Sequence, residues 1–544
     1  MKPKYIFVVG GVMSGVGKGV AASSIGKILQ ARGFKVTSIK IDPYVNVDAG
    51  TMNPTEHGEV FVLDDGMECD QDMGNYERFL GTNLSRSNYM TTGSIYQTVI
   101  ARERNLGYGG KCVEVVPHIP LEVIRRVDVA IKDNHAEIGI VEVGGTVGEY
   151  QNILFLEAVR MLKIKRPDDV ALVLVSYLPI RNDENEPKTK PTQYAVRSLN
   201  SAGLQPDIVL ARAKSAIDAK RKETISVNCS IAVDDIISAP DVESIYEVPV
   251  NFEHGNLSTR ILRKLGLRPR GRDLKDWKRL VGRIHKSTEQ VRIGIVGKYF
   301  GSGSYILADS YISVIEAVKH AAAEVGRKPV IEWIDAESFE KDKDTLVSLA
   351  GYHGVIIPGG FGSRGVEGKI LAINYLREHK IPYFGLCYGM QLAVVEFARN
   401  VLGLKQAHTT EINAETPDPV VDILPEQRKN MREKNYGATM RLGAYPATLK
   451  RATIARRAYG KPEISERHRH RFEINPEYIE RLEAKGMVFS GSSPDRRLME
   501  IMELPQSAHP FFLGTQFHPE LKSRPLHPHP LFVEFLRASS KRRV

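Results

Sequence analysis

Apolar runs alternate with amphipathic stretches through the first 240 residues of the chain. Each run is apolar along most of its length, which is typical of strands buried on both faces of a parallel sheet. A glycine-rich turn follows the first run and leads into a helix that ends near Gly33, and a second helical pattern covers 119–132. This alternation predicts a mostly parallel sheet with helices on both faces. The predicted strands are 4–10, 35–41, 138–143, 170–177 and 207–211.

The alternation lapses between 267 and 290, where LRPRGRDLKDWKRLVGRIHKSTEQ is polar, basic and weakly periodic. A second pattern of strands and helices then begins, with a helix expected at 308–325. We therefore predict an α/β protein of two doubly wound parallel-sheet domains, residues 1–267 and 290–544, joined by a linker at 268–289. The strands expected in the second domain are 291–299, 328–335, 354–360 and 381–387.

The chain of 544 residues is too long for a single hydrophobic core. Its 42% hydrophobic and 26% charged residues are ordinary for a soluble globular protein. The longest apolar stretch, VALVLVSYLPI, is far short of a membrane span, and the short run after Lys4 does not resemble a secretory signal. The cysteines have no CxxC spacing, which argues against a disulfide framework or a zinc site and for a reducing, cytoplasmic compartment. They are Cys69, Cys112, Cys229 and Cys387.

The net charge of +10 has two interpretations: binding of nucleic acid, or binding of anionic small molecules together with a solvated basic surface. No motif of a nucleic-acid-binding fold accompanies the charge, so the sequence favours small anions over a nucleic-acid or membrane partner. Many basic residues gather in expected linkers and loops, namely 268–286, 428–434, 450–461 and the C-terminal SKRRV.

One cysteine lies in a pattern that indicates nucleophilic catalysis. Cys387 stands between an expected strand and an expected helix, within G-x-C-x-G, which is the pattern of a nucleophile elbow. The N-terminus of the following helix would stabilise a thiolate. The alternative interpretation is a buried core cysteine, because free cysteines are among the most buried residues.

Two further elements favour catalysis. GVIIPGGFG ends a strand with two glycines, whose backbone N–H groups can face an oxyanion. GTQFHPE supplies His518 and Glu520, the base and the orienting acid that a thiol nucleophile needs. Over about residues 290–540 the chain resembles the class I glutamine amidotransferases, which implies a triad of Cys387, His518 and Glu520. The implied glutamine and oxyanion-hole residues are Gly360, Cys387, Tyr388, Gly389, Met390 and Gln391.

A phosphate-binding turn is expected at the other end of the chain. GGVMSGVGKG follows the first strand and opens the first helix, where backbone N–H groups can cradle phosphates and Lys18 can reach the transferred one. The turn is one residue longer than G-x-x-x-x-G-K-[ST], and Gly19 replaces the hydroxyl residue. The alternative is a glycine-rich turn without a ligand. Because the hydroxyl is missing, Mg²⁺ would need carboxylates, and Asp72 and Glu142 are the candidates unless they are merely solvated acids.

Long and irregular strings along the whole chain resemble the CTP synthase family. They include KIDPYVNVDAGTMNPTEHGEVFV, CDQDMGNYERF, VEVGGTVGE, KTKPTQ, GGFGSRGVEGK and RHRHRFEIN. The resemblance implies a P-loop amidoligase joined to a class I glutaminase, catalysing ATP + UTP + glutamine + water → CTP + ADP + phosphate + glutamate. It also implies GTP as allosteric activator, CTP as feedback inhibitor, Mg²⁺ as cofactor and a cytoplasmic homotetramer.

The resemblance carries over residue by residue. Glu411 and Arg471 complete the glutamine site, where the Arg471 guanidinium would pair with the substrate α-carboxylate. ATP and Mg²⁺ are expected at Ser14, Gly15, Val16, Gly17, Lys18, Gly19, Val20, Lys40, Asp72, Glu142, Pro240, Asp241 and Val242. UTP and CTP are expected at Ser14, Glu149, Tyr150, Gln151, Lys188, Thr189, Lys190, Pro191, Thr192, Gln193 and Thr224.

Three positions depart from the family pattern. Gln151 stands where a glutamate is usual, and Thr224 stands where a nucleotide-binding lysine is expected. Lys222 could substitute for that lysine if the segment is a strand, because residues two apart then share a face, but not if it is a helix. Tyr388 replaces a leucine, although only its backbone N–H is needed.

Two other interpretations stay open at this point. The first is another amidoligase fused to a glutaminase, such as a cobyric acid synthase, which the KTKPTQ and RHRHRFE strings argue against. The second is a P-loop ATPase that serves as a filament-forming scaffold with a decayed glutaminase, which the intact Cys–His–Glu set argues against.

Overall fold

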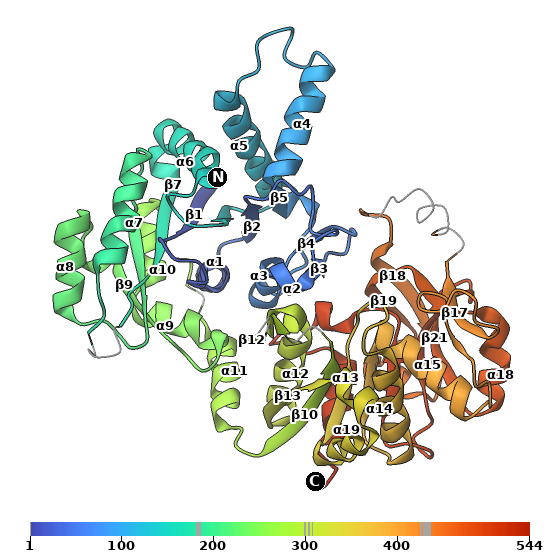
Figure 1. The fold of residues 1–544 in the computed structure, drawn as a ribbon. Coiled ribbons are helices and arrows are strands. Elements are labelled where there is room, and N and C mark those ends of the chain that lie inside the picture. Colours follow the sequence, from blue (N-terminus) through green and yellow to red (C-terminus); the bar gives the residue numbers. More distant parts are fainter. Residues whose placement is uncertain are drawn as a thin grey trace. The chain divides into compact units, whose positions relative to one another are not determined.

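The chain forms two compact units in a computed structural model that describes residues 2–180, 186–271, 273–298, 301–302, 305–306, 308–424, 427 and 437–544. Unit 1 contains Met1–Ala49 and Asp72–Val281, and unit 2 contains Gly50–Gln71 and Gly282–Val544. The chain thus enters unit 2 for a short segment and returns before it finally crosses over (Figure 1). The basic stretch 428–434 lies outside the described residues.

Unit 1 is built on a parallel sheet with the strand order β5-β2-β6-β1-β7-β8-β9. All its described strand pairs are parallel, and β1 lies between β6 and β7 with Val8 opposite Glu142. The predicted strand at 35–41 lies one residue later, and the others agree closely. The strands are β1 (Lys4–Gly10), β2 (Val36–Asp42), β5 (Tyr89–Thr91), β6 (Ile138–Val143), β7 (Val170–Tyr177), β8 (Ile208–Ala213) and β9 (Ile236–Pro240).

The central strands of unit 1 are buried along almost their whole length, as their apolar sequences require. Helices cover both faces of the sheet, and the helical pattern at 119–132 is part of α5. The helices are α1 (Lys18–Ala31), α3 (Asp72–Leu80), α4 (Thr92–Arg104), α5 (Val115–Asp133), α6 (Ile153–Lys165), α7 (Lys190–Ser201), α8 (Ala219–Cys229), α9 (Val248–His254) and α10 (Leu257–Lys264). The predicted linker contains a further helix, α11 (Lys275–Lys286).

Unit 2 has a mixed sheet with the order β13-β10-β14-β15-β23-β22-β21-β18-β19. Its first five strands pair in parallel, whereas the pairings from β23 onward are antiparallel. The α/β class is therefore confirmed, but the sheet is parallel only in part. The reason is that β22 joins β23 through a short connection, which leaves no room for the crossover helix that parallel neighbours need.

The strands of this sheet are β10 (Gln290–Gly297), β13 (Lys328–Asp335), β14 (Gly354–Ile357), β15 (Tyr383–Leu386), β18 (Arg441–Leu449), β19 (Glu463–His470), β21 (Val488–Ser492), β22 (Met499–Glu503) and β23 (Phe512–Thr515). Its helices are α12 (Ile312–Val325), α13 (Ala336–Lys341), α14 (Val366–Glu378), α15 (Tyr388–Asn400), α17 (Ile454–Tyr459), α18 (Ile479–Ala484) and α19 (Pro530–Ser539). A small sheet joins β16 (His408–Thr409), β17 (Pro419–Ile423) and β20 (Phe472–Ile474). No helix among the described residues is long and apolar enough to cross a membrane.

The segment Gly50–Gln71 belongs to unit 2, although the sequence analysis keeps it in the N-terminal domain. It forms α2 (Pro54–His57) and a hairpin of β3 (Val60–Val62) and β4 (Glu68–Asp70). Two carboxylates of this segment bind alternate arginines of β19. Asp64 Oδ1 lies 2.6 Å from Arg467 Nε, and Glu68 Oε1 lies 2.8 Å from Arg469 Nε.

Candidate functional sites

Cys387 occupies a tight turn between β15 and α15. Its backbone has φ 50° and ψ −99°, a strained conformation for a residue with a side chain and one that nucleophile elbows adopt. The turn is possible because Gly389 has no side chain, since a Cβ there would lie 2.2 Å from the carbonyl oxygen of Ile357. The G-x-C-x-G pattern therefore has a steric cause.

The predicted triad residues come together. His518 follows β23, and its Nδ1 lies 2.7 Å from Oε1 of the buried Glu520. Burial acts to lower the pKa of His518, but the charge of Glu520 and the Cys387 thiol outweigh it and raise that pKa well above 6.5. The imidazole is thus oriented by a carboxylate and poised to accept the thiol proton.

A glutamine that the sequence analysis did not single out contacts the nucleophile. Gln516 Nε2 lies 3.6 Å from Cys387 Sγ, and Gln391 Nε2 lies 3.2 Å from Gln516 Oε1. The carbonyl oxygen of Arg469 lies 3.9 Å from the same sulfur. The only signal for Gln516 was its place inside GTQFHPE.

A cavity of about 720 Å³ opens onto Cys387 and His518. Six of the eight predicted glutamine-site residues line it, Cys387 among them, while Met390 is buried in the hydrophobic core of unit 2 and Gly389 packs against Ile357. Residues Gly50–Pro54, which belong to the segment Gly50–Gln71, line another part of the wall. The predicted residues on the wall, besides the triad, are Gly360, Tyr388, Gln391, Glu411 and Arg471.

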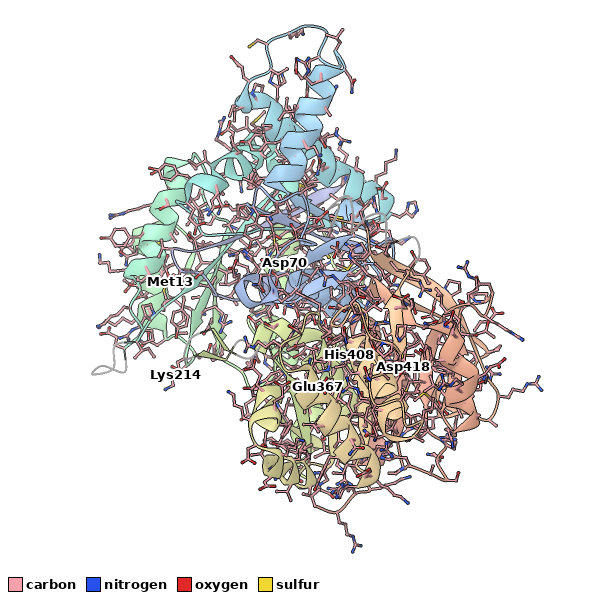
Figure 2. All side chains as sticks on the ribbon, turned by 45° about the vertical axis from the view of Figure 1, so that its right-hand side comes forward. Met13, Asp70, Lys214, Glu367, His408 and Asp418 are labelled. Atoms are coloured by element: carbon pink, nitrogen blue, oxygen red, sulfur yellow. The ribbon has the colours of Figure 1, made fainter. Side chains whose placement is uncertain are left out.

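Glu411 faces the turn that follows β14. Its Oε1 accepts a hydrogen bond from the Gly362 N–H at 2.7 Å, and burial raises its pKa above the ordinary value. The preceding strand, β16, contacts α14, because His408 Nε2 lies 3.4 Å from Glu367 Oε1. Both side chains are labelled in Figure 2. Arg471 also lines the cavity, and its guanidinium donates to Gln427 Oε1 at 2.6 Å.

Lys369 of α14 is fully buried, and its Nζ has no hydrogen-bond partner within the described part of the chain. The Nζ lies 5.4 Å from the centroid of the Tyr388 ring. Burial, and secondarily the charge of Lys298, lower the pKa of Lys369 to about 7, although Glu411 acts in the opposite direction. Burial thus makes the Lys369 ammonium costly wherever the pH keeps it protonated.

Lys369→Met is expected to stabilise unit 2 by about 1–3 kcal/mol at pH 6, because it removes a buried ammonium and keeps the apolar stem. In the unfolded chain the lysine binds its proton up to a pKa of about 10.4. The loss of folding stability caused by the buried ammonium is therefore largest below pH 7 and decreases as the pH rises from 7 towards 10. Urea unfolding at several pH values measures it, with the exposed Lys319→Met as control. A variant no more stable than the parent at pH 6 would contradict the prediction.

In unit 1, the predicted phosphate site is the glycine-rich turn before α1. Met13, labelled in Figure 2, lies on its exposed part. Lys18 Nζ donates to the Gly145 carbonyl oxygen at 2.7 Å, and burial lowers the pKa of Lys18. A Cβ on Gly19 would lie only 2.0 Å from Asp72 Oδ1. The carboxylate of Asp72 therefore takes the place of the hydroxyl side chain that the longer turn lacks.

Carboxylates surround one buried lysine beside this turn. Lys40 Nζ contacts Asp72 Oδ2, lies 3.1 Å from Glu142 Oε1 and lies 3.6 Å from Asp42 Oδ1. Burial and the neighbouring Asp72 raise the pKa of Glu142, and burial raises that of Asp42 to about 6. In this group the Lys40 ammonium offsets part of the carboxylate charge. No set of three His, Cys, Asp or Glu side chains that could hold a metal is found among the described residues.

The predicted pyrimidine-nucleotide loop, Lys188–Gln193, lies near this turn because it contacts β7. Thr192 Oγ1 lies 2.9 Å from Ser176 Oγ, and the latter lies 3.0 Å from where a Cβ on Gly11 would stand. Lys190 Nζ donates to Gln193 Oε1 at 3.2 Å. The N-terminus of α7 therefore lies beside the phosphate turn.

Arg212 was not predicted from the sequence. Its NH2 lies 2.5 Å from Asp241 Oδ1, and its NH1 lies 2.7 Å from where a Cβ on Gly17 would stand. It thus joins the phosphate turn to the predicted Pro240-Asp241-Val242 loop. Its position at the carboxyl end of a parallel strand, next to the loops that bind ligands in such folds, is the signal that could have found it.

Of the three departures from the family pattern, Gln151 and Thr224 lie at the surface, whereas Tyr388 is buried. Glu149 accepts from Thr146 Oγ1 at 2.6 Å, and Gln151 donates to Glu149 Oε2 at 3.3 Å, whereas Tyr150 is 93% exposed. Thr224 lies on α8, so the segment is helical and Lys222 does not share its face. Of the two options left open for Lys222, the helix excludes substitution for the missing lysine.

Comparisons with known proteins match both parts of the chain. Residues 4–267 match the family "CTP synthase N-terminus", and residues 306–538 match "Glutamine amidotransferase class-I". The chain is 51% identical to the CTP synthase of Pyrococcus furiosus over 540 residues, which cover 99% of this chain and 98% of that protein. It is 46% identical to the CTP synthase of Halalkalibacterium halodurans over 543 residues, with full coverage of both.

Among solved structures, the chain is similar to the glutaminase domain of Trypanosoma brucei CTPS with bound acivicin. That match is 36% identical, covers 47% of this chain and 95% of that chain, and has a TM-score of 0.43.

Proposed function

The chain belongs to the CTP synthase family, and from this premise we propose how its residues divide the work. The enzyme is a glutamine-hydrolysing ligase of pyrimidine biosynthesis that aminates UTP to CTP. We assign glutamine hydrolysis to the domain at 290–544 and amination to the domain at 1–267, with 268–289 as the linker. The observation that carries the assignment is the Cys387–His518–Glu520 constellation, which opens onto a cavity of its own.

In the glutaminase half, Cys387 Sγ attacks the side-chain carbonyl carbon of glutamine. His518 takes the thiol proton and passes it to the departing ammonia, leaving a thioester that water then hydrolyses to glutamate. The backbone N–H groups of Gly360 and Tyr388 stabilise the oxyanion of each tetrahedral intermediate. Glu411 binds the substrate α-ammonium and Arg471 its α-carboxylate, since both face the cavity with opposite charges.

In the synthase half, the difficulty is that the C4 oxygen of uracil is a poor leaving group. That oxygen attacks the γ-phosphorus of ATP and releases ADP, which converts the oxygen into a phosphate ester. Ammonia then attacks C4, loses protons and expels phosphate. Because ammonia is largely protonated in water near neutral pH, it must pass from Cys387 to the uracil without equilibrating with solvent.

Lys18 and the turn Ser14–Val20 hold the ATP phosphates, and the Pro240–Val242 loop with Arg212 holds the rest of the nucleotide. Asp72 and Glu142 would hold Mg²⁺ together with phosphate oxygens, because Mg²⁺ prefers carboxylates and phosphates and the Asp72 carboxylate lies against the turn. Mg²⁺ supplies neutralisation of the charge that develops on the transferred phosphoryl group. The Lys40 ammonium forms ion pairs with these same two carboxylates, Asp72 and Glu142.

UTP and the inhibitor CTP would share Glu149–Gln151, Lys188–Gln193 and Thr224, and GTP would activate the glutaminase half. A homotetramer is supported by apolar side chains that are exposed on α4, α5 and their connection. In Figure 1 these two helices and their connection project from the sheet of unit 1. These side chains are Ile100, Leu106, Val115, Val116 and Leu121. We place the enzyme in the cytoplasm, in keeping with four free cysteines.

Feedback by CTP is expected to strengthen in Gln151→Glu and Thr224→Lys. A carboxylate at 151 accepts stronger hydrogen bonds from ribose hydroxyls than an amide does, and an ammonium at 224 would meet a phosphate. Each change should lower the CTP inhibition constant several-fold, which corresponds to about 1 kcal/mol. Ser201→Lys, at the far end of α7, controls for added charge. If neither change tightens CTP binding, Glu149 or another residue already compensates.

The function itself is tested by absorbance-monitored conversion of UTP to CTP with ATP and glutamine. A scaffold with a decayed glutaminase would release no glutamate and form no CTP under these conditions.

A further inference from the structure

We propose that the Tyr388 side chain positions the oxyanion hole, by tying the nucleophile helix to the turn that carries the other N–H donor. The inference rests on the proposed glutaminase function and goes beyond it, since that function needs only the backbone N–H of Tyr388. Tyr388 is the first residue of α15 and directly follows Cys387.

The two proposed oxyanion donors lie on separate segments of the chain. The Tyr388 N–H belongs to the start of α15, whereas the Gly360 N–H belongs to the turn after β14. A displacement of about 1 Å between such groups can cost a factor of about a hundred in rate. Something must therefore keep the turn at a fixed distance from the helix.

The Tyr388 phenol makes that connection directly. It is 1% exposed, and its hydroxyl donates to the Gly362 carbonyl oxygen at 3.3 Å, two residues beyond Gly360. Two other side chains also bind Gly362. Glu411 accepts from the Gly362 N–H, and Lys298 donates to the Gly362 carbonyl oxygen at 3.3 Å. The turn is thus fixed by three side chains, of which only Tyr388 also belongs to the nucleophile helix.

The Tyr388 ring also contacts the buried Lys369. The buried Lys369 Nζ lies 5.4 Å from the centroid of the Tyr388 ring, at a distance where a ring face attracts an ammonium. This contact holds the ring in the orientation that directs its hydroxyl at Gly362. An aliphatic residue at 388 would supply neither contact.

Tyr388→Phe in the full-length enzyme tests the proposal, because it removes only the hydroxyl. The kcat for glutamine hydrolysis should fall about threefold to tenfold, the range expected for one neutral hydrogen bond. The KM for glutamine should stay within about twofold, since the lost contact acts on the transition state. The rate of Cys387 alkylation by iodoacetamide should not change, because alkylation forms no oxyanion.

A matched control is Tyr352→Phe, which removes a phenol hydrogen bond of 3.0 Å to Glu332, outside the cavity lining. It should leave kcat unchanged. An unchanged kcat in Tyr388→Phe would overturn the proposal, and so would an equal fall in alkylation, which would place the effect on the nucleophile. Neither outcome bears on the proposed glutaminase function, which is tested separately by glutamine hydrolysis in the parent enzyme and in Cys387→Ala.

Discussion

Cys387→Ala is expected to abolish glutamine-dependent CTP synthesis, by at least about a thousandfold, and to spare synthesis from added ammonium. Alanine removes the only atom that can form the thioester, and neither Gln516 nor the Arg469 carbonyl, which lie near the sulfur, is a nucleophile that can replace it. Amination needs ammonia, ATP and UTP but no thiol, so external ammonium should enter after the missing step. Both rates are measured by the absorbance change from UTP to CTP.

The matched control is Cys229→Ala, which removes a buried thiol at the end of α8, outside both candidate sites. It should retain both activities. Loss of ammonium-dependent synthesis in a folded Cys387→Ala enzyme would show that the two chemistries are not divided as proposed. Glutamine hydrolysis that survives in it would remove Cys387 from the mechanism.

Lys18→Ala is expected to remove synthesis from glutamine and from ammonium alike, by at least about a hundredfold, because phosphoryl transfer precedes amination in both. The Lys18 ammonium lies beside the glycine-rich turn, where it can meet the charge that develops on the transferred group. Asp72→Asn and Glu142→Gln should act in the same direction, since each weakens the proposed Mg²⁺ site.

Lys27→Met controls for the loss of a lysine on the same helix, since Lys27 contacts the Trp277 ring and no residue of the phosphate turn. Glutamine hydrolysis by Lys18→Ala should persist in part, because the triad is unchanged. Measuring it distinguishes a defect in the synthase half from a defect in the whole enzyme. Robust ammonium-dependent synthesis in Lys18→Ala would show that the phosphate assignment is wrong.

Five of the seven strands of unit 1 were predicted, because each is buried on both faces and a nearly continuous apolar run marks it, whereas β5 and β9 were not predicted. The antiparallel part of the sheet in unit 2 was not predicted, since β19 carries polar or charged residues at seven of its eight positions and β18 is interrupted by Gly443 and Pro446. Nor could periodicity show that Gly50–Gln71 joins unit 2, because its attachment depends on ion pairs with Arg467 and Arg469, about four hundred positions away in the sequence.

The sequence by itself determined the family, the reaction and the identity of the chemical groups, because the strings that carry them are long and irregular. The G-x-C-x-G pattern is local, and five residues predicted the turn at Cys387, although the atom that excludes a side chain at Gly389 is the carbonyl oxygen of Ile357 on β14. Tertiary structure decided what depends on contacts between distant segments. Gln516 against the thiol, Arg212 against the phosphate turn and Lys369 beneath Tyr388 are such contacts. Each depends on how separate elements pack, and no local pattern of residues specifies that distance.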